Sequence, residues 1–161
     1  MPDFEAARAG LASQPFSRLL GARLTEFGAG AATLELDIRD ELQQQNGFVH
    51  GGVLAYAADN ALTFAAGTVL GAALLTAGFT IDYLRPATGV TLRARAVVVQ
   101  ASRLRATCRC EVYTVDGDGE TTLCAAAQGS ARVVRPRQVP SRDEPYGKPF
   151  TRNENPEADA G

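Results

Sequence analysis

The sequence predicts an α+β domain in which an antiparallel β-sheet wraps around one long central α-helix. Two strand-like segments come early in the chain, one long apolar segment follows, and four more strand-like segments come after it. The apolar segment, residues 51–66, is apolar almost all round, which is typical of a helix buried on most sides. A sheet must cover one of its faces, and this helix is apolar enough to do so.

The segments before the central helix are read from their hydrophobic periodicity and from the positions of Gly and Pro. Polar and apolar residues alternate along the second strand, so we expect one of its faces to be exposed to solvent and the other to be buried. In order, we expect an amphipathic helix over 3–13, a helical turn over 16–20 after Pro15, strands over 23–27 and 31–38 around the turn Gly28-Ala-Gly30, and a polar loop over 40–49.

The segments after the central helix form an antiparallel meander. Gly67 to Gly71 is expected to end the helix, because glycine is unfavourable in a helix interior. Asp116-Gly-Asp-Gly119 is a strong hairpin signal, because glycine tolerates a positive φ. The expected strands cover 74–83, 90–100, 104–113 and 121–134, with a turn at Ala101-Ser-Arg103.

Composition indicates a single domain over residues 1–134 and a tail over 135–161 that is rich in Pro and charge. The chain has 161 residues and a net charge of −2, without the basic patch that nucleic-acid binding requires. Residues 51–75 are largely apolar, but Asp59 and Asn60 interrupt them, so we expect no membrane span.

The three cysteines are Cys108, Cys110 and Cys124, and they are expected to be packing residues. An odd number of cysteines, with no secretory signal in the first residues, favours the reducing cytoplasm. One His and scattered cysteines offer no ligand set for a metal, so no metal site is expected.

Two glycines, Gly51 and Gly52, stand where the polar loop meets the central helix. They let a ligand approach the backbone closely, and the first turn of a helix presents free N–H groups and the positive end of its dipole. This junction therefore suits an anion, or a carbonyl oxygen that gains negative charge during a reaction.

Asp59 is a carboxylic acid inside the apolar helix, where an unpaired charge is costly. It is a candidate catalytic group, although it could instead bond Asn60 or a backbone N–H. Gly51 and Asp59 are eight residues apart, which separates them by about 12 Å along a helix. One small reacting group cannot touch both, so cooperation between them requires two subunits, with antiparallel helices and two-fold symmetry.

The segment Asn46-Gly-Phe-Val-His-Gly-Gly52, with Asp59 eight residues after Gly51, resembles the hotdog-fold thioesterases of the phenylacetic-acid-degradation (PaaI-like) type. The resemblance continues through Thr76-Ala-Gly-Phe-Thr-Ile-Asp-Tyr-Leu-Arg-Pro86 and covers roughly residues 16–134. It implies a homodimer with composite sites, a dimer of dimers, and an acyl-CoA substrate with no other cofactor.

The resemblance implies a role for each matching catalytic position. The N–H of Gly51 would polarise the thioester carbonyl, and Asp59 would attack that carbonyl or activate water. Gln44 would orient the nucleophile or water, unless Gln43, Gln45 or Asn46 does so or Gln44 is loop surface. Thr76 would assist from the partner subunit, or would be an ordinary strand residue. His50 would fix the loop, or would act as a base.

Residues expected at the substrate are Asn46, Gly52, Asn60 and Arg85, and Arg85 would either meet the CoA phosphates or flank a strand. The apolar residues Leu54, Tyr56, Leu62 and Phe64 would suit a medium-chain or aryl acyl group, although most of them could equally be core. Two alternatives remain: a dehydratase or hydratase of the same fold, although no His-Phe-Pro segment precedes the helix, and a non-catalytic acyl-CoA sensor.

Overall fold

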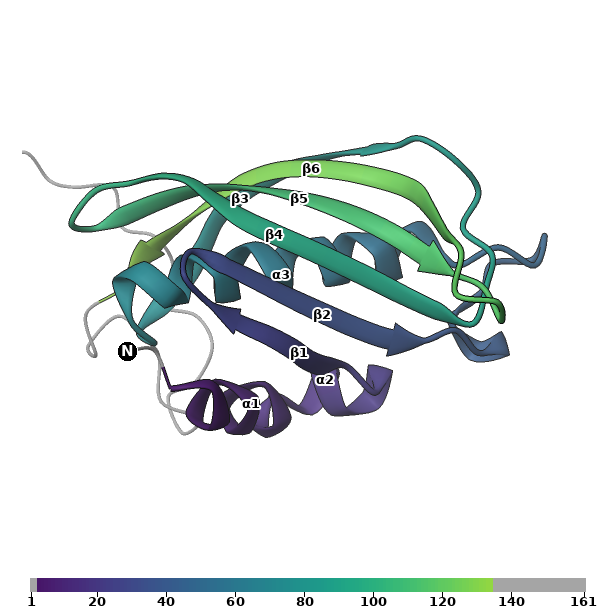
Figure 1. Cartoon of the computed structure of the whole chain (residues 1–161), viewed down its shortest axis with the longest axis horizontal. Helices are drawn as coiled ribbons and strands as arrows, with labels where there is room; N and C mark the ends of the chain where they lie inside the picture. Colours follow the sequence, from purple (N-terminus) through teal and green to yellow (C-terminus); the bar gives the residue numbers. More distant parts are fainter. Residues whose placement is uncertain (1–2, 135–161) are drawn as a thin grey trace, which may run out of the picture.

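The structure is a computed structural model that describes residues 3–134, so the expected tail over 135–161 lies outside the described residues. Its elements follow the expected order (Figure 1). They are α1 (Phe4–Ser13), α2 (Pro15–Leu20), β1 (Arg23–Gly28), β2 (Ala31–Asp37), the 3-10 turn η1 (Asp40–Leu42), α3 (Gly51–Leu70), β3 (Leu74–Tyr83), β4 (Thr91–Ala101), β5 (Arg105–Val115) and β6 (Thr121–Val133).

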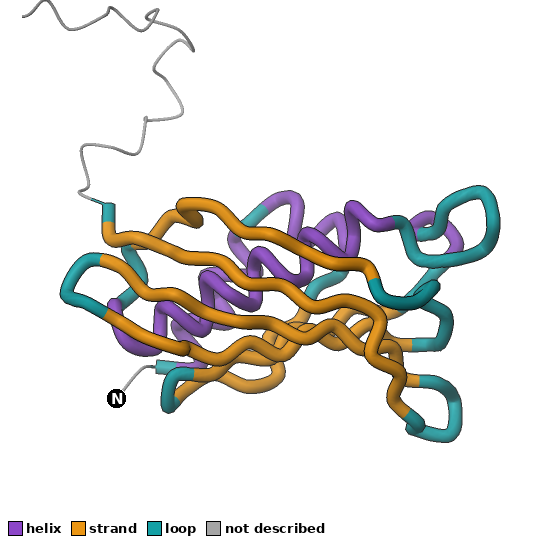
Figure 2. The backbone as a smooth tube through the Cα atoms, turned by 90° about the horizontal axis from the view of Figure 1, so that it is seen from above, coloured by secondary structure: helices purple, strands orange, loops and turns teal. Residues whose placement is uncertain are grey.

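The six strands form one sheet in the order β1-β2-β4-β5-β6-β3, and every neighbouring pair is antiparallel. The strands wrap around α3, as the tube view shows (Figure 2). This is the predicted α+β, hotdog arrangement of an antiparallel sheet around one long central helix. Strands β1 and β3 are the two edges, and α1 and α2 lie beside β1 (Figure 1).

The core lies between α3 and the concave face of the sheet. Five of the seven fully buried residues of α3 are alanines, which lets the strands approach the helix closely. The sheet contributes buried side chains to the core, among them Leu34, Leu36, Leu92 and Val112. The helix is long and apolar enough to cross a membrane by length and composition, but here it is the core helix of the domain.

Most boundaries differ from the sequence prediction by one or two residues, and two differences change which residues belong to an element. The helix α3 runs through Gly67 and ends only at Leu70, where Gly71 takes a φ of 87°. One glycine inside a helix costs about 1 kcal/mol, which burial of the rest of this helix offsets. Ala101 belongs to β4, where it pairs with Ala106, and was wrongly expected in a turn; Ser102 closes the shorter hairpin by bonding the backbone of Arg105.

Strand β3 contains a β-bulge. Thr76 pairs with Ala131 and Gly78 pairs with Ser130, so Ala77 is an extra residue without a partner. Inward-facing positions change from even to odd numbers at this point: Thr76 is half-buried before the bulge, and Phe79 is half-buried after it. Bulges of this kind re-aim side chains and are frequent next to active sites.

Candidate active site

The start of α3 is capped by His50. Its Nδ1 accepts a hydrogen bond from Gly52 N–H at 2.9 Å. Among the described residues no acceptor bonds the N–H of Gly51, the first residue of the helix. The junction thus presents a free N–H at the positive end of the helix dipole, as the sequence predicts for this position.

Tyr83 lies across this junction from β3. Its hydroxyl donates to the carbonyl oxygen of Gly51 at 3.0 Å. A Cβ at position 51 would stand 3.3 Å from Cζ of Tyr83, which is tight for a side chain packed against the ring. Sequence reasoning missed Tyr83, because a contact between residues 32 positions apart leaves no local signal.

A cavity of about 360 Å³ opens at the start of α3. Gly51, Tyr83, Gln44 and Arg85 line it, together with apolar residues such as Leu54. The Oε1 atom of Gln44 accepts a hydrogen bond from Asn46 N–H at 2.7 Å, which orients the Gln44 amide, whereas Asn46 is itself exposed.

Arg85 is exposed at the same cavity. Its Nη1 donates to the backbone oxygen of Leu123 at 3.1 Å, so part of the guanidinium is engaged by the protein. The remaining donors of the guanidinium are free to meet an anion such as a phosphate.

Asp59 lies on the exposed side of α3, where it is half-buried. The hydroxyl of Thr76 donates to Asp59 Oδ1 at 2.6 Å, and Oγ1 of Thr63 lies 2.8 Å from Oγ1 of Thr76. A hydroxyl has one proton, so Thr76, which donates to the carboxylate, must accept from Thr63. The three side chains form one directed chain that ends on the carboxylate, and we call it the Thr63–Thr76–Asp59 relay.

The relay leaves the carboxylate available for chemistry. Among the described residues no Arg or His forms an ion pair with Asp59, and no donor bonds its Oδ2. One oxygen is therefore held and oriented while the other is free to attack a carbonyl or to accept a proton from water. Sequence reasoning also missed Thr63, whose spacing of four residues from Asp59 on one helix is a usable signal.

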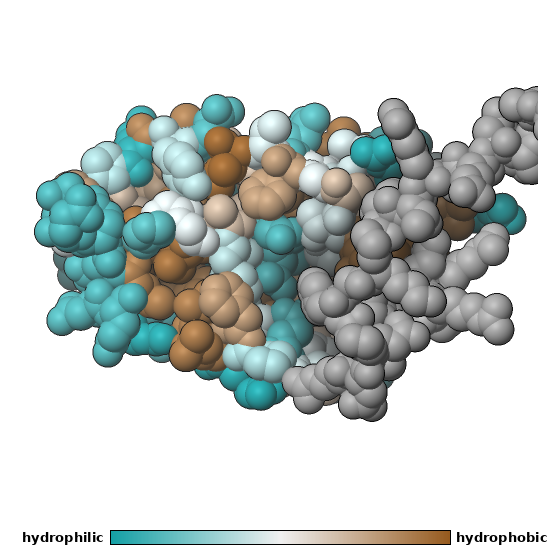
Figure 3. Space-filling model, turned by 180° about the vertical axis from the view of Figure 1, so that it is seen from behind, coloured by the Kyte–Doolittle hydropathy of each residue, from teal (hydrophilic) through white to brown (hydrophobic). Residues whose placement is uncertain are grey.

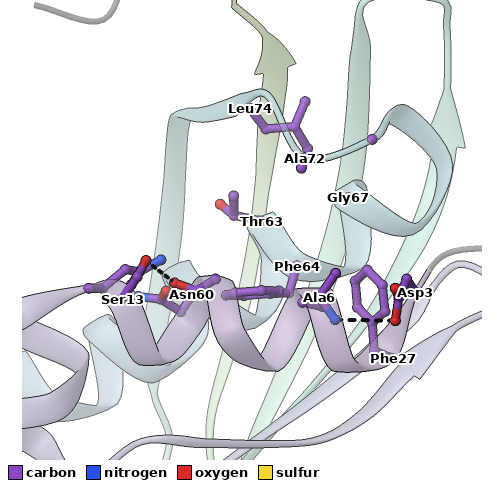
Figure 4. Close-up of a pocket in the computed structure, with 14 residues that line it drawn as sticks. Asp3, Ala6, Ser13, Phe27, Asn60, Thr63, Phe64, Gly67, Ala72 and Leu74 are labelled. Carbon is purple, nitrogen blue, oxygen red and sulfur yellow. Dashed lines mark hydrogen bonds between the residues drawn. The ribbon is translucent and has the colours of Figure 1, made fainter.

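A second and larger cavity, of about 500 Å³, lies between α1 and the C-terminal half of α3 (Figure 4). Asn60, Thr63 and Phe64 line it from α3, and Leu74 lines it from the start of β3. No residue lines both cavities. The predicted site residues thus fall into two groups within one chain, one around Gly51 and the other around Asp59.

The other candidate residues are buried or bonded within the fold. Burial raises the pKa of the Cys108 thiol to about 11 and that of Cys110 to about 12, so neither is a thiolate nucleophile at neutral pH. Leu62 is buried in the core, and the hydroxyl of Tyr56 donates to Ser17 Oγ at 2.7 Å. Within residues 3–134 no cluster of His, Cys, Asp and Glu could hold a metal ion.

Comparison with known proteins points to the same fold and the same family as the sequence resemblance. The model of the family described as "Thioesterase superfamily" matches residues 46–121, which include Gly51 and Asp59. A curated protein from Sulfurisphaera tokodaii, provisionally named an esterase, is 26% identical over 119 residues, which span 73% of this chain and 86% of that protein.

Two solved structures combine similar folds with appreciable identity. A thioesterase family protein from Silicibacter pomeroyi is 30% identical with a TM-score of 0.76, over 81% of this chain and 96% of that one. The phenylacetic acid degradation protein PaaI from Thermus thermophilus, solved as a mutant, is 30% identical with a TM-score of 0.65, over 75% of this chain and 100% of that one. Because the fold, the family match and these relatives all agree, we conclude that this chain belongs to the thioesterase superfamily of hotdog proteins.

Proposed function

We propose that this protein is an acyl-CoA thioesterase that hydrolyses a thioester to a free acid and CoA with Asp59 as its catalytic carboxylate. The observation that carries the proposal is the Thr63–Thr76–Asp59 relay, which holds one carboxylate oxygen and leaves the other free. Membership of the thioesterase superfamily supplies the reaction class. The remaining question is which residues meet the thioester, and the geometry suggests an assignment.

In this assignment the N–H of Gly51 bonds the thioester carbonyl oxygen, with Gln44 beside it in the same cavity. The positive end of the helix dipole favours the negative charge that develops on this oxygen in the transition state. Asp59 Oδ2 then either attacks the carbonyl carbon, or takes a proton from a water that attacks. If the carboxylate attacks, the C–S bond breaks as a mixed anhydride with Asp59 forms, and water then hydrolyses this anhydride to the free acid and the restored carboxylate. If water attacks, the C–S bond breaks and the free acid forms directly. In both routes CoA leaves as a thiolate that gains a proton.

The active unit in this proposal is a two-fold dimer, in which Gly51 of one protomer faces Asp59 of the other. Support comes from the separation of these two residues along α3, because Gly51 lines the smaller cavity and Asp59 does not. Strand β3 is a ten-residue sheet edge with Leu75 46% exposed and Tyr83 55% exposed, and such long apolar edges need a cover. Pairing of β3 with its own copy would set the two α3 helices antiparallel.

The surface is compatible with an interface of this kind. On the face seen from behind, apolar side chains gather in patches among hydrophilic ones (Figure 3). We propose that part of this surface is buried in the dimer, and that two dimers pair into a tetramer. Arg85, at the mouth of the smaller cavity, would meet a CoA phosphate, and the three buried, unpaired cysteines suit the cytoplasm.

Thiol release from acyl-CoA tests the proposal with Asp59→Asn, which keeps the size of the side chain and removes its charge. We expect kcat for butyryl-, octanoyl- and phenylacetyl-CoA to fall by roughly a thousandfold or more, as is usual when an enzyme loses its nucleophile or general base. Asp118→Asn is the matched control, because Asp118 is an exposed carboxylic acid in the β5–β6 hairpin, outside both cavities and away from β3, and it should keep wild-type turnover.

Two results would argue against the proposal. Asp59→Asn with wild-type turnover would remove Asp59 from the chemistry. A folded wild-type protein that binds acyl-CoA and hydrolyses none of the panel would instead identify a non-catalytic acyl-CoA sensor. Turnover of enoyl-CoA with water, without thiol release, would identify a hydratase.

A further inference from the structure

The larger cavity borders the catalytic carboxylate without containing it. Thr63 lines this cavity, and its hydroxyl lies 2.8 Å from that of Thr76, which in turn donates to Asp59. A carbonyl carbon held at Asp59 therefore has a wall residue of the cavity, Thr63, one helical turn further along α3. Any group attached to that carbon that turns toward the C-terminal half of α3 enters this space.

The walls of the cavity are mostly apolar and come from four elements (Figure 4). Phe64 lies on α3, Phe27 comes from β1, and Leu74 comes from the start of β3. The helix α1 closes the near side with small residues such as Ala6 and Gly10. A volume of about 500 Å³ falls within the roughly 300–1,000 Å³ of small-molecule sites.

Two glycines inside helices face this one cavity. Gly10 lies in α1 and Gly67 lies in α3, and neither has a positive φ that would require glycine. A Cβ at Gly10 would meet nothing within 4 Å, and one at Gly67 would make only ordinary contacts with Phe27 and Leu74 at 3.9 and 4.0 Å. Glycine in a helix interior is less stable than alanine, so its presence twice at one space indicates a role in keeping that space open.

The charge of the cavity restricts what it can hold. No Lys, Arg or His is among the described residues that line it, and Asp3 at one end carries a carboxylate that caps α1. A ligand with a negative end would meet no cation here and would be repelled by Asp3. The apolar walls and this charge together favour an uncharged hydrocarbon group.

We infer that this cavity holds the acyl group of the substrate, that Gly10 and Gly67 set its depth, and that it selects uncharged medium-chain or aryl acyl groups. The inference rests on the proposed thioesterase function and adds the location of the acyl group. It assigns a selective role to α1, a helix that contributes no residue to the relay or to the start of α3.

The test is Gly67→Leu and Gly10→Leu, each of which puts a branched side chain into the cavity. The measured quantity is kcat/KM for octanoyl-CoA divided by that for butyryl-CoA, because only the longer chain reaches the filled region. We expect this ratio to fall at least about tenfold in both variants. Ala9→Leu in α1 and Val69→Leu in α3 are the controls, since both residues are exposed and neither lines a cavity.

A second arm tests the charge of the cavity with acyl chains of equal length. Wild-type protein should prefer hexanoyl-CoA to adipyl-CoA, which carries a carboxylate at its far end, by at least about tenfold in kcat/KM. Equal turnover of the two would overturn the assignment of an uncharged acyl group.

Binding separates this inference from the proposed function. If wild-type protein hydrolyses the panel and the octanoyl-to-butyryl ratio is unchanged in both variants, the acyl assignment fails and the thioesterase proposal stands. Affinities for octanoyl-CoA and butyryl-CoA, measured by calorimetry in the Asp59→Asn background, need no turnover. There, a loss of octanoyl-CoA affinity of about tenfold on adding Gly67→Leu supports the acyl assignment even if the protein is no hydrolase, and no loss overturns it.

Discussion

At the scale of single residues, the candidate site depends on which oxygen of Asp59 is held. The sequence alone predicts Asp59, because a carboxylic acid in an apolar helix needs a partner or a use. It cannot show that Thr76 bonds Oδ1, because these residues are 17 positions apart and come from different elements. Thr63 was open to prediction from its helical spacing, since side chains four residues apart share one face.

Thr76→Val removes the hydroxyl of the relay while keeping a branched side chain of similar size. We expect kcat for a thioester to fall roughly tenfold or more with KM within about twofold, because the carboxylate loses its orienting donor and substrate binding does not change. Thr76→Ser keeps the hydroxyl and should retain most of the wild-type kcat. A merely structural role for Thr76 would show itself as equal rates in the Val and Ser variants, with any loss confined to stability.

At the scale of the elements, β3 is the strand that sequence patterns describe least well. Leu75, Ala77, Phe79 and Ile81 alternate, so a regular strand would point all four to the core and leave Thr76 outside. The extra residue Ala77 shifts the alternation by one position. Thr76, before the bulge, therefore points toward α3, and Phe79, after the bulge, still points to the core. A bulge is set by how two strands pair, so periodicity within one strand does not reveal it, whereas the strand order and the central helix follow from local patterns.

Gly129 on β6 allows β3 to lie close enough for this geometry. A Cβ at Gly129 would stand 2.4 Å from the Cβ of Phe79 and 2.7 Å from the oxygen of Gly78, so one of the strands would have to move. We expect Gly129→Ala to lower the free energy of unfolding by about 1–3 kcal/mol, the usual cost of overpacking, and to lower kcat through displacement of Thr76.

Urea denaturation measures the stability of this variant, and the matched control is Gly117→Ala in the β5–β6 hairpin. Gly117 has no atom within 4 Å of a built Cβ, so its variant should stay within about 0.5 kcal/mol of wild type. Equal stabilities for the two variants would show that the β3–β6 approach tolerates a side chain.

At the scale of the whole molecule, the length of α3 separates the two halves of the candidate site. The helical rise places Gly51 and Asp59 about 12 Å apart along the axis, an expectation available from the sequence. In the structure Gly51 lines the smaller cavity, whereas Asp59 lines neither cavity and is connected to the larger one through Thr76 and Thr63. Strand β3 is an edge of the sheet. The size and walls of the cavities depend on contacts between α1, α3 and β3, which no single segment encodes.

A mixture of two inactive variants tests whether the site is shared between protomers. Gly51→Pro removes one N–H at a helix position that favours proline, and the extended backbone of His50 suits the residue before proline. Gly51→Ala adds the same contact with Tyr83 but keeps the N–H, so it is the control. Co-refolded with Asp59→Asn, the Gly51→Pro protein should recover about a quarter of wild-type turnover, because half of the dimers carry one intact composite site.

Size-exclusion chromatography with light scattering on the same samples verifies that the mixed species is a dimer or a multiple of one. No recovery of turnover in a confirmed mixed dimer would mean that Gly51 and Asp59 act within one chain or not together. Turnover by the Gly51→Pro protein alone would mean that the N–H is dispensable, and turnover by the Asp59→Asn protein alone would mean that the carboxylate is dispensable.

The place of α1 in the chain has a consequence for how such proteins diversify. The helix forms one wall of the larger cavity, yet it lies before residues 46–121, the stretch that matches the thioesterase superfamily. The wall that α1 supplies, Gly10 included, can therefore change while Thr63, Asp59 and Thr76 stay the same, whereas the wall that α3 supplies lies within the matched stretch. A gene that exchanges or trims its first codons can alter what this cavity admits while the residues of the relay stay as they are.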